Sequence, residues 1–108
     1  MKKLMLMILT AVLLSGLTSF ALAAADKGQG VYMNFCAACH DSGIAGAPKV
    51  GDAADWQKRA EKGTQALIDN AINGYQGSTG YMPAKGGHSA LSDEEVTAAV
   101  KYMLSQSQ

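Results

Sequence analysis

The chain has 108 residues, in which nine lysines and arginines balance nine aspartates and glutamates, and it contains only two cysteines. A chain of this length holds one small domain. No basic stripe runs through it, which disfavours nucleic-acid binding, and the sequence has neither an internal repeat nor a low-complexity segment.

The first 25 residues predict a secretory signal peptide. A basic start at Lys2-Lys3 is followed by an apolar run over residues 4–14, and small residues lead to Ala23-Ala24-Ala25. This order is typical of a leader that is cleaved after an A-x-A site. The alternative is an uncleaved membrane anchor, because residues 4–25 nearly reach the length of a transmembrane helix. Polar and small residues within the segment favour cleavage before Asp26 and export to the periplasm.

Residues 26–108 are expected to form a single domain of 83 residues. All nine acidic residues lie in this part against seven basic ones, so its net charge is about −2. A domain this short buries a limited core and often needs a disulfide, a metal or a cofactor for stability. A covalently held group would supply apolar bulk that the chain itself lacks.

Residues 26–38 predict a helix that carries the motif Cys36-Ala37-Ala38-Cys39-His40. Val31 and Phe35 lie four residues apart on one face of this helix. The spacing C-x-x-C-H is the covalent attachment site of c-type haem. Its two thiols add to the haem vinyl groups, and its histidine binds the iron. The motif therefore predicts one haem, attached through Cys36 and Cys39.

Three other roles for a C-x-x-C pair fit this sequence less well. A redox dithiol of this kind belongs to a βαβ context, and no strand pattern is visible here. A structural zinc site needs four ligands, but the only other histidine is His88 and there are no further cysteines. A structural disulfide between Cys36 and Cys39 is the third role, which an oxidising compartment would permit.

Short helices and long glycine-rich loops are predicted after the motif. Residues 41–51 form a loop, residues 52–62 a helix that ends at Gly63, and Thr64 caps a further helix that ends at Asn73-Gly74. Residues 75–90 have no periodic pattern. Loops this long are uncommon in a small domain and usually serve its function.

The last helix has the clearest signals. Ser92 and Glu95 form a capping box, and Asp93 and Glu94 complement the helix dipole. One apolar stripe follows, made of Val96, Ala99, Val100 and Met103. The elements together predict a small all-α domain.

The second axial ligand of the iron decides the chemistry, since an open position permits ligand binding and a filled one favours electron transfer. Met82 is the preferred candidate, because it lies in the glycine-rich loop 42 residues after His40 and Pro83 restricts it to an extended backbone. Met33 shares the helix of the cysteines, and Met103 belongs to the apolar stripe. His88 is the alternative, and a bis-histidine site would lower the reduction potential.

With these residues in place, the chain resembles the class I c-type cytochromes, most closely cytochrome c5. Six segments in the family's order carry the resemblance between about Gly28 and Met103. They are Val31-Tyr32 with Cys36–His40, Gly46–Lys49, Trp56 with Arg59, Ala71–Tyr75, Met82–Gly87, and Leu91–Met103. The family implies a small cytochrome c fold, in which four to five helices and long loops surround one covalently attached haem.

The resemblance also implies roles for residues around the haem. The carbonyl of Pro48 accepts a hydrogen bond from the His40 ring, which orients the ring and raises its basicity. Trp56 and Arg59 pack near the haem propionates and hydrogen-bond them. Gly28 and Tyr32 let the first and last helices cross closely, with an aromatic residue such as Tyr102 in the contact.

Two departures from cytochrome c5 stand out. Several members carry an extra cysteine pair before the last helix, whereas residues 87–90 here contain none. Residues 78–81 lengthen the approach to Met82 relative to shorter members. We therefore expect a more mobile loop and a different surface around the haem edge.

The sequence predicts an exported electron carrier rather than an enzyme. Its haem c, ligated by His40 and Met82, would pass single electrons between respiratory redox proteins in transient encounters. We expect no nucleic-acid partner and no small-molecule substrate. Contact with membranes is expected only through redox partners. One alternative is a peroxidase-like haem enzyme or gas sensor with a displaceable sixth ligand, for which only His88 could serve as the distal group. Another is a structural subunit of a larger haem complex.

Overall fold

A long helix opens the structure, which is a computed structural model that describes residues 20 and 22–108. Residues 22–31 are α-helical, the helix widens into a π-helical turn over Tyr32–Cys36 (η1), and α2 continues it over Ala37–His40. The predicted helix over residues 26–38 therefore extends in both directions. Most of the predicted signal peptide, residues 1–19 and 21, lies outside the described residues.

The π-helical turn sits directly before the C-x-x-C-H motif. The backbone N–H of Ala37 bonds the carbonyl of Tyr32, five residues earlier. This inserts one extra residue into the turn and rotates the residues that follow relative to those before it. Such turns are rare and occur frequently at functional sites.

Two short helices follow the motif. A 3₁₀ turn over Ile44–Gly46 (η2) lies in the predicted loop, and α3 spans Ala53–Ala60, with the Asp52 side chain accepting from the Asp55 N–H at 3.3 Å. The next helix, α4, spans Thr64–Asn73. The prediction that Thr64 caps α4 was wrong. Gly63 occupies the cap position with φ +92°, and no side chain bonds the end of the helix.

A small hairpin replaces part of the segment that was predicted to be irregular. Strand β1 (Tyr75–Gln76) pairs antiparallel with β2 (Tyr81–Met82), and Tyr75 lies opposite Met82. Two-residue strands are too short to produce an alternating pattern in the sequence. A second 3₁₀ turn, Ala84–Gly87 (η3), leads away from the hairpin.

Helix α5 (Asp93–Ser105) confirms the prediction for the C-terminal part of the chain. Ser92 Oγ accepts from the Glu95 N–H at 3.1 Å, and the Glu95 carboxylate accepts from the Ser92 N–H at 3.2 Å. The four residues of the predicted stripe are all buried: Val96, Ala99, Val100 and Met103. The stripe therefore faces the interior.

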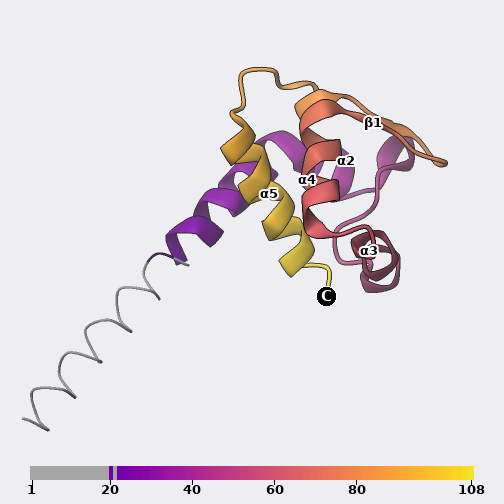
Figure 1. Cartoon of the computed structure of the whole chain (residues 1–108), viewed down its shortest axis with the longest axis horizontal. Helices are drawn as coiled ribbons and strands as arrows, with labels where there is room; N and C mark the ends of the chain where they lie inside the picture. The colour runs from indigo at the N-terminus through magenta and orange to yellow at the C-terminus, as the bar shows by residue number, and fades with distance from the viewer. Residues whose placement is uncertain (1–19, 21) are drawn as a thin grey trace, which may run out of the picture.

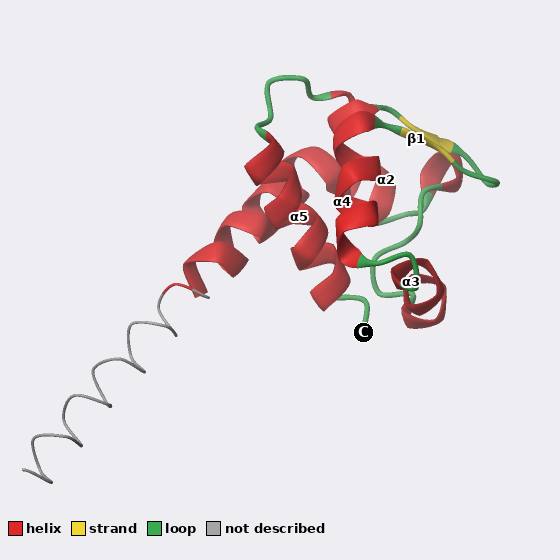
Figure 2. Ribbon diagram, viewed as in Figure 1, coloured by secondary structure: helices red, strands yellow, loops and turns green. Residues whose placement is uncertain are grey.

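The first and last helices cross closely at a glycine. A Cβ at Gly28 would lie 2.3 Å from the Ala98 carbonyl oxygen, so only glycine fits here. Next to the crossing, the rings of Tyr32 and Tyr102 are 5.5 Å apart. In Figures 1 and 2, α4 and α5 lie in the centre of the domain and the hairpin lies at its upper right. The first helix extends from the domain toward the lower left.

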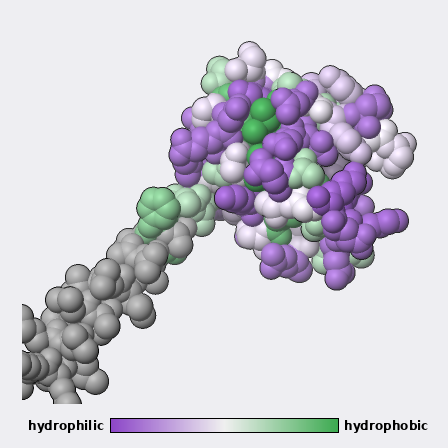
Figure 3. All heavy atoms as spheres, viewed as in Figure 1, coloured by the Kyte–Doolittle hydropathy of each residue, from purple (hydrophilic) through white to green (hydrophobic). Residues whose placement is uncertain are grey.

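Two groups of buried side chains form the core. The first joins Ile68 and Ala71 of α4 to Leu91, Val96 and Val100, and the second consists of Tyr32, Trp56, Ala99 and Met103. Hydrophilic residues cover most of the face seen in Figure 3, with small apolar patches between them. Of the residues described, none belongs to a helix long and apolar enough to cross a membrane.

Candidate functional site

One crevice brings together the preferred residues of the predicted haem site. It lies between α2, α4, α5 and the hairpin, and apolar groups provide most of its walls. Its lining includes Cys36, Cys39, His40, Pro48, Trp56, Arg59 and Met82. These residues come from segments up to 46 positions apart, so their convergence is a property of the fold and not of the motif alone.

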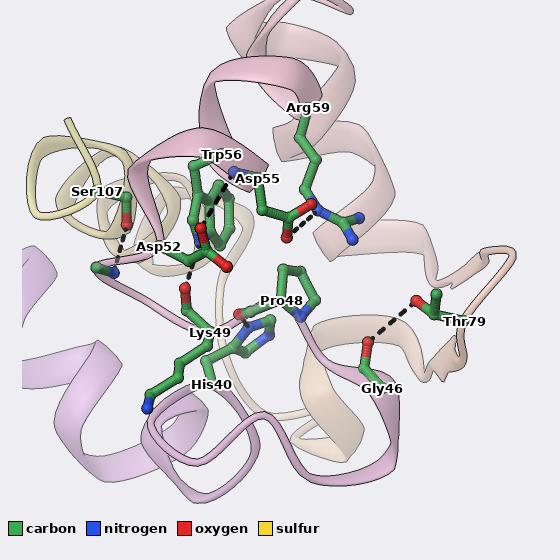
Figure 4. Close-up of polar contacts among 11 residues, drawn as sticks. His40, Gly46, Pro48, Lys49, Asp52, Asp55, Trp56, Arg59, Thr79 and Ser107 are labelled. Atoms are coloured by element: carbon green, nitrogen blue, oxygen red, sulfur yellow. Dashed lines mark hydrogen bonds and ion pairs between the residues drawn. The ribbon is translucent and has the colours of Figure 1, made fainter.

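His40 is buried, and one of its ring nitrogens has a fixed partner. Its Nδ1 lies 2.8 Å from the Pro48 carbonyl oxygen (Figure 4). Because a carbonyl can only accept, Nδ1 carries the proton and the lone pair of Nε2 stays free. The pKa of His40 is lowered, mainly because the ring is buried. The ring is therefore neutral at pH 7. A neutral imidazole with a free Nε2 is the form that binds a metal.

Cys36 immediately precedes α2 and Cys39 lies within it, and the two cysteines differ in exposure. Cys36 is half-buried and Cys39 is exposed. Burial raises the pKa of the Cys36 thiol to about 11, with a smaller contribution from Cys39. Redox-active dithiols depend on a lowered thiol pKa. The environment of Cys36 therefore disfavours the dithiol-enzyme interpretation.

Met82 is the sulfur-bearing side chain of the hairpin that reaches the crevice. It is partly buried and packs against the Ile68 group of the core. Met33, by contrast, is 64% exposed on the first helix. Met103 lines the crevice too, but it is buried in the core among Tyr32 and Trp56. Met82 is thus the methionine that lines the crevice without belonging to either group of buried core residues.

His88 lies on the other side of Phe35. It is exposed, and its ring meets that of Phe35 edge-on at a centroid distance of 5.1 Å. The groove that it lines is bounded by the first helix and the segment before α5, outside the crevice described above. Its position does not favour ligation or a distal acid–base role.

Trp56 and Arg59 bracket the crevice from α3. The Trp56 indole N–H donates to the Lys49 carbonyl at 2.8 Å, and its ring centroid is 6.4 Å from that of His40. Arg59 Nε pairs with Asp55 at 2.9 Å, and the guanidinium end extends beyond this pair (Figure 4). Trp56 therefore supports the His40 side of the crevice, and Arg59 brings a positive charge to it.

Two loops interlock at one edge of the crevice, a contact that the sequence did not predict. A Cβ at Gly46 would lie 2.0 Å from the Thr79 carbonyl oxygen, and one at Gly80 would lie 2.3 Å from that of Ala45. The Thr79 hydroxyl also donates to the Gly46 carbonyl at 3.2 Å (Figure 4). This clasp joins the tip of the hairpin to η2 and closes the edge.

Sequence reasoning also assigned no role in the site to Lys62, Asn70, Tyr75 and Lys85, which are among the other polar residues that line the crevice. Lys62 and Tyr75 bond one another, with Nζ and the phenol oxygen 2.9 Å apart. Tyr75 ends one of the segments that carry the resemblance, but nothing in the sequence placed it beside Lys62. Only the fold brings them to the crevice.

The donor set fits a covalently attached haem. Two thiols, a neutral imidazole and a thioether line one largely apolar crevice, and these are the groups that c-type haem requires. Among the described residues, no group of three or more histidines, cysteines and acids could hold a metal ion alone. The arrangement thus suits a metal that arrives inside an organic cofactor.

The comparisons with known proteins agree with one another on the family. A family model described as cytochrome c oxidase, cbb3-type, subunit III matches residues 23–103. Cytochrome c-555 of Chlorobaculum tepidum is 48% identical over 97 residues, which cover 90% of this chain and 88% of that protein. Cytochrome c5 of Azotobacter vinelandii is 38% identical over 81 residues, which cover 73% of this chain and 93% of that protein. The c-555 relative thus shares more residues with this chain than the c5 relative does.

The fold has a counterpart among solved structures. A chain from the crystal structure of an electron transfer complex of nitrite reductase with cytochrome c aligns with a TM-score of 0.66 and 34% sequence identity. The alignment covers 76% of this chain and 95% of that one. The small, mostly helical fold predicted from the sequence is therefore confirmed.

Proposed function

We propose that this chain, which belongs to the mono-haem c-type cytochromes represented by cytochromes c-555, c5 and c-551, carries single electrons between respiratory redox proteins. Its relatives are cytochrome electron carriers and not enzymes. The observation that carries the proposal is the convergence of Cys36, Cys39, His40 and Met82 on one crevice. Each of the four supplies a group that this cofactor needs.

The proposed roles follow from the chemistry of these side chains. Cys36 and Cys39 attach one haem c through thioether bonds, and the bound iron supplies a centre that gains and loses one electron. His40 offers Nε2 on one side, held in orientation by Pro48. Met82 offers its thioether on the other. With a histidine and a methionine both available as iron ligands, an attached haem would have no open coordination position for a substrate.

The electron-carrier role is supported over a peroxidase-like enzyme or gas sensor. Catalysis or gas binding would need an open or easily displaced ligand and a distal acid–base group. His88 is the only histidine besides His40, and it packs against Phe35 outside the crevice. The crevice lining includes three cationic side chains, Arg59, Lys62 and Lys85, and no described aspartate or glutamate, which does not favour proton abstraction.

We also propose that residues 1–25 are a signal peptide, removed on export to the periplasm. The apolar side chains of Phe20 and Leu22 are 80% and 67% exposed and take no part in the core. The first helix packs closely on α5 at Gly28, two residues beyond the proposed cleavage point before Asp26. These observations agree with a domain that starts after the leader.

The proposed partners are redox proteins that give and accept electrons in brief encounters. The solved neighbour comes from an electron transfer complex with nitrite reductase, which supports redox enzymes as a partner class for this chain. Interfaces of this kind are small. A net charge of about −2 on residues 26–108 gives only weak long-range steering.

A methionine series tests the proposed ligation. The oxidised holoprotein should show the methionine–iron charge-transfer band, and Met82→Ala should abolish it. Met33→Ala and Met103→Leu serve as controls and should retain the band, because Met33 is exposed and Met103 belongs to the core. A band that survives Met82→Ala but disappears in Met103→Leu would reassign the ligand.

A further inference from the structure

Two polar side chains are buried in the part of the chain that the structure describes: His40, which is 8% exposed, and Ser107, which is 3% exposed. A buried polar group costs free energy unless it is hydrogen-bonded. The His40 ring has its partner in the Pro48 carbonyl. Ser107 lies two residues beyond the end of α5, far from the C-x-x-C-H motif in the sequence. Its burial implies that its hydroxyl has partners inside the fold.

The Ser107 hydroxyl uses both its donor and its acceptor capacity. It donates to the Met103 carbonyl of α5 at 2.8 Å, and its Oγ accepts from the backbone N–H of Gly51 at 3.0 Å (Figure 4). Gly51 lies 56 positions earlier in the chain. One side chain thus joins the end of α5 to the loop between η2 and α3.

The loop that contains this glycine also provides two hydrogen-bond partners of His40. The Pro48 carbonyl accepts from Nδ1 of the ring at 2.8 Å, and the Val50 N–H donates to the His40 backbone carbonyl at 2.8 Å. Between them, the Lys49 carbonyl accepts from the Trp56 indole at 2.8 Å. A shift of the loop would therefore move the group that orients the imidazole.

Hydrogen bonds hold much of this part of the chain, because little of it is buried. Residues 41–55 are all described by the structure, and none of them is buried. Val50 is partly buried and packs on the second group of core residues, whereas Gly51 is exposed and a Cβ there would meet nothing within 4 Å. Among the hydrogen bonds of the described residues, the bond to Ser107 is the one that ties this segment to the end of α5.

We propose that Ser107 is a positioning residue for the iron ligand His40. By holding Gly51, it fixes the loop whose Pro48 carbonyl accepts the Nδ1 proton. The proposal rests on the function proposed above, because it concerns how His40 binds the iron of an attached haem. A hydrogen bond at Nδ1 makes the imidazole a stronger electron donor, which favours Fe(III) and lowers the reduction potential. Releasing the loop weakens that bond, so the potential should rise.

Alanine substitutions at two nearby serines test this role in the holoprotein. Ser107→Ala removes the hydroxyl that holds Gly51. Ser105→Ala is the matched control, because Ser105 is exposed and its hydroxyl donates to the Tyr102 carbonyl of its own helix at 2.6 Å. Ser107→Thr keeps a hydroxyl at the site. The readouts are the reduction potential and the rates at which the Gly51 N–H and the His40 Nδ1–H exchange with deuterated water, measured by NMR on the reduced protein.

Ser107→Ala should speed the exchange of the Gly51 N–H by about two- to tenfold, as the loss of one hydrogen bond would. It should also speed the exchange of the His40 Nδ1–H and raise the reduction potential, because the Pro48 carbonyl is no longer held in place. We expect Ser105→Ala to leave all three values at those of the wild type, and Ser107→Thr to restore them.

Faster exchange at Gly51 with unchanged exchange at His40 and an unchanged potential would overturn the proposal, since Ser107 would then serve the fold alone. So would a potential that rises only together with loss of the charge-transfer band, because the change would then lie at Met82. Equal shifts in Ser107→Ala and Ser105→Ala would overturn it too. Wild-type protein that carries no covalently attached haem would instead contradict the proposed function, and this role of Ser107 with it.

Discussion

His40 has one ring nitrogen fixed and one left free, and several residues share in producing this state. Pro48 accepts the Nδ1 proton, burial lowers the pKa of the ring, and Trp56 packs beside it while its own N–H holds the Lys49 carbonyl. The residue after the histidine is anchored as well, because the Asp41 carboxylate accepts from the phenol of Tyr32. The imidazole is therefore oriented by its surroundings before any metal binds.

The Tyr32 phenol gives a pH-dependent prediction. Burial, followed by the hydrogen bond and charge of Asp41, raises the pKa of Tyr32 above its ordinary value, which is about 10. Above that pH the unfolded chain loses the proton while the folded protein keeps it, so the free energy of unfolding falls as the pH rises. Tyr32→Phe should be less stable at neutral pH by about 1 kcal/mol, for the lost hydrogen bond, and should lose less stability between neutral and alkaline pH. Denaturant titrations at several pH values measure both, and parallel pH profiles would contradict the assignment.

Elements in this protein are positioned by close backbone approach as much as by apolar stripes. The first helix meets α5 at Gly28, and η2 meets the hairpin at Gly46 and Gly80. The Gly28 contact lies outside the crevice lining, and the contact of Gly46 with Gly80 lies within it. One fixes the helix that delivers the cysteines, and the other fixes the hairpin that delivers Met82.

Gly28 and Gly30 provide a matched pair on one helix. Gly28→Ala should destabilise the holoprotein by about 1–3 kcal/mol, because the new Cβ would overlap the Ala98 carbonyl and force the helices apart. A Cβ at Gly30 meets nothing within 4 Å, so Gly30→Ala should be neutral or stabilising by up to about 1 kcal/mol. Denaturant unfolding of both variants measures the difference. Equal stabilities would mean that the crossing does not need glycine.

The sequence predicted the elements that have strong local signals and missed those that depend on contacts. The capping box at Ser92 and the α5 stripe were correct because both patterns lie within a few turns of helix. Thr64 was misassigned because Gly63, with its positive φ, ends the preceding turn and takes the cap position itself. The π-helical turn, which adds a residue to a turn without changing the apolar pattern, left no signal in the sequence.

At the scale of the whole molecule, the crevice is lined by residues of both buried groups of the core. All four residues of the α5 stripe line it, together with Trp56 and Ala71. Filling the crevice therefore covers side chains from both buried groups at once.

The site residues could be predicted because C-x-x-C-H and Met82-Pro83 are short motifs. Lys62 and Tyr75 could not, because the fold alone brings α3 and β1 to the same wall.

A chain without an attached haem should fold poorly, because the side chains that line the crevice would not be covered. The variant Cys36→Ser/Cys39→Ser, expressed through the same export route, cannot form thioether bonds, and its crevice walls would stay in contact with water. We expect lower helix content and a broader thermal transition than in the holoprotein, because so small a domain has little other apolar area to bury. Far-ultraviolet circular dichroism measures both. A variant with the holoprotein's helicity and cooperative melting would show that the fold is stable without the cofactor.

The central claim is a haem with both axial positions filled by His40 and Met82. A spectroelectrochemical titration of the purified holoprotein, repeated under carbon monoxide, tests it most directly. We predict one reversible one-electron step, low-spin six-coordinate spectra in both oxidation states, and no effect of carbon monoxide on the reduced form. A five-coordinate high-spin spectrum at neutral pH, or rapid binding of carbon monoxide by the reduced protein, would contradict the account and favour a ligand-binding haem protein.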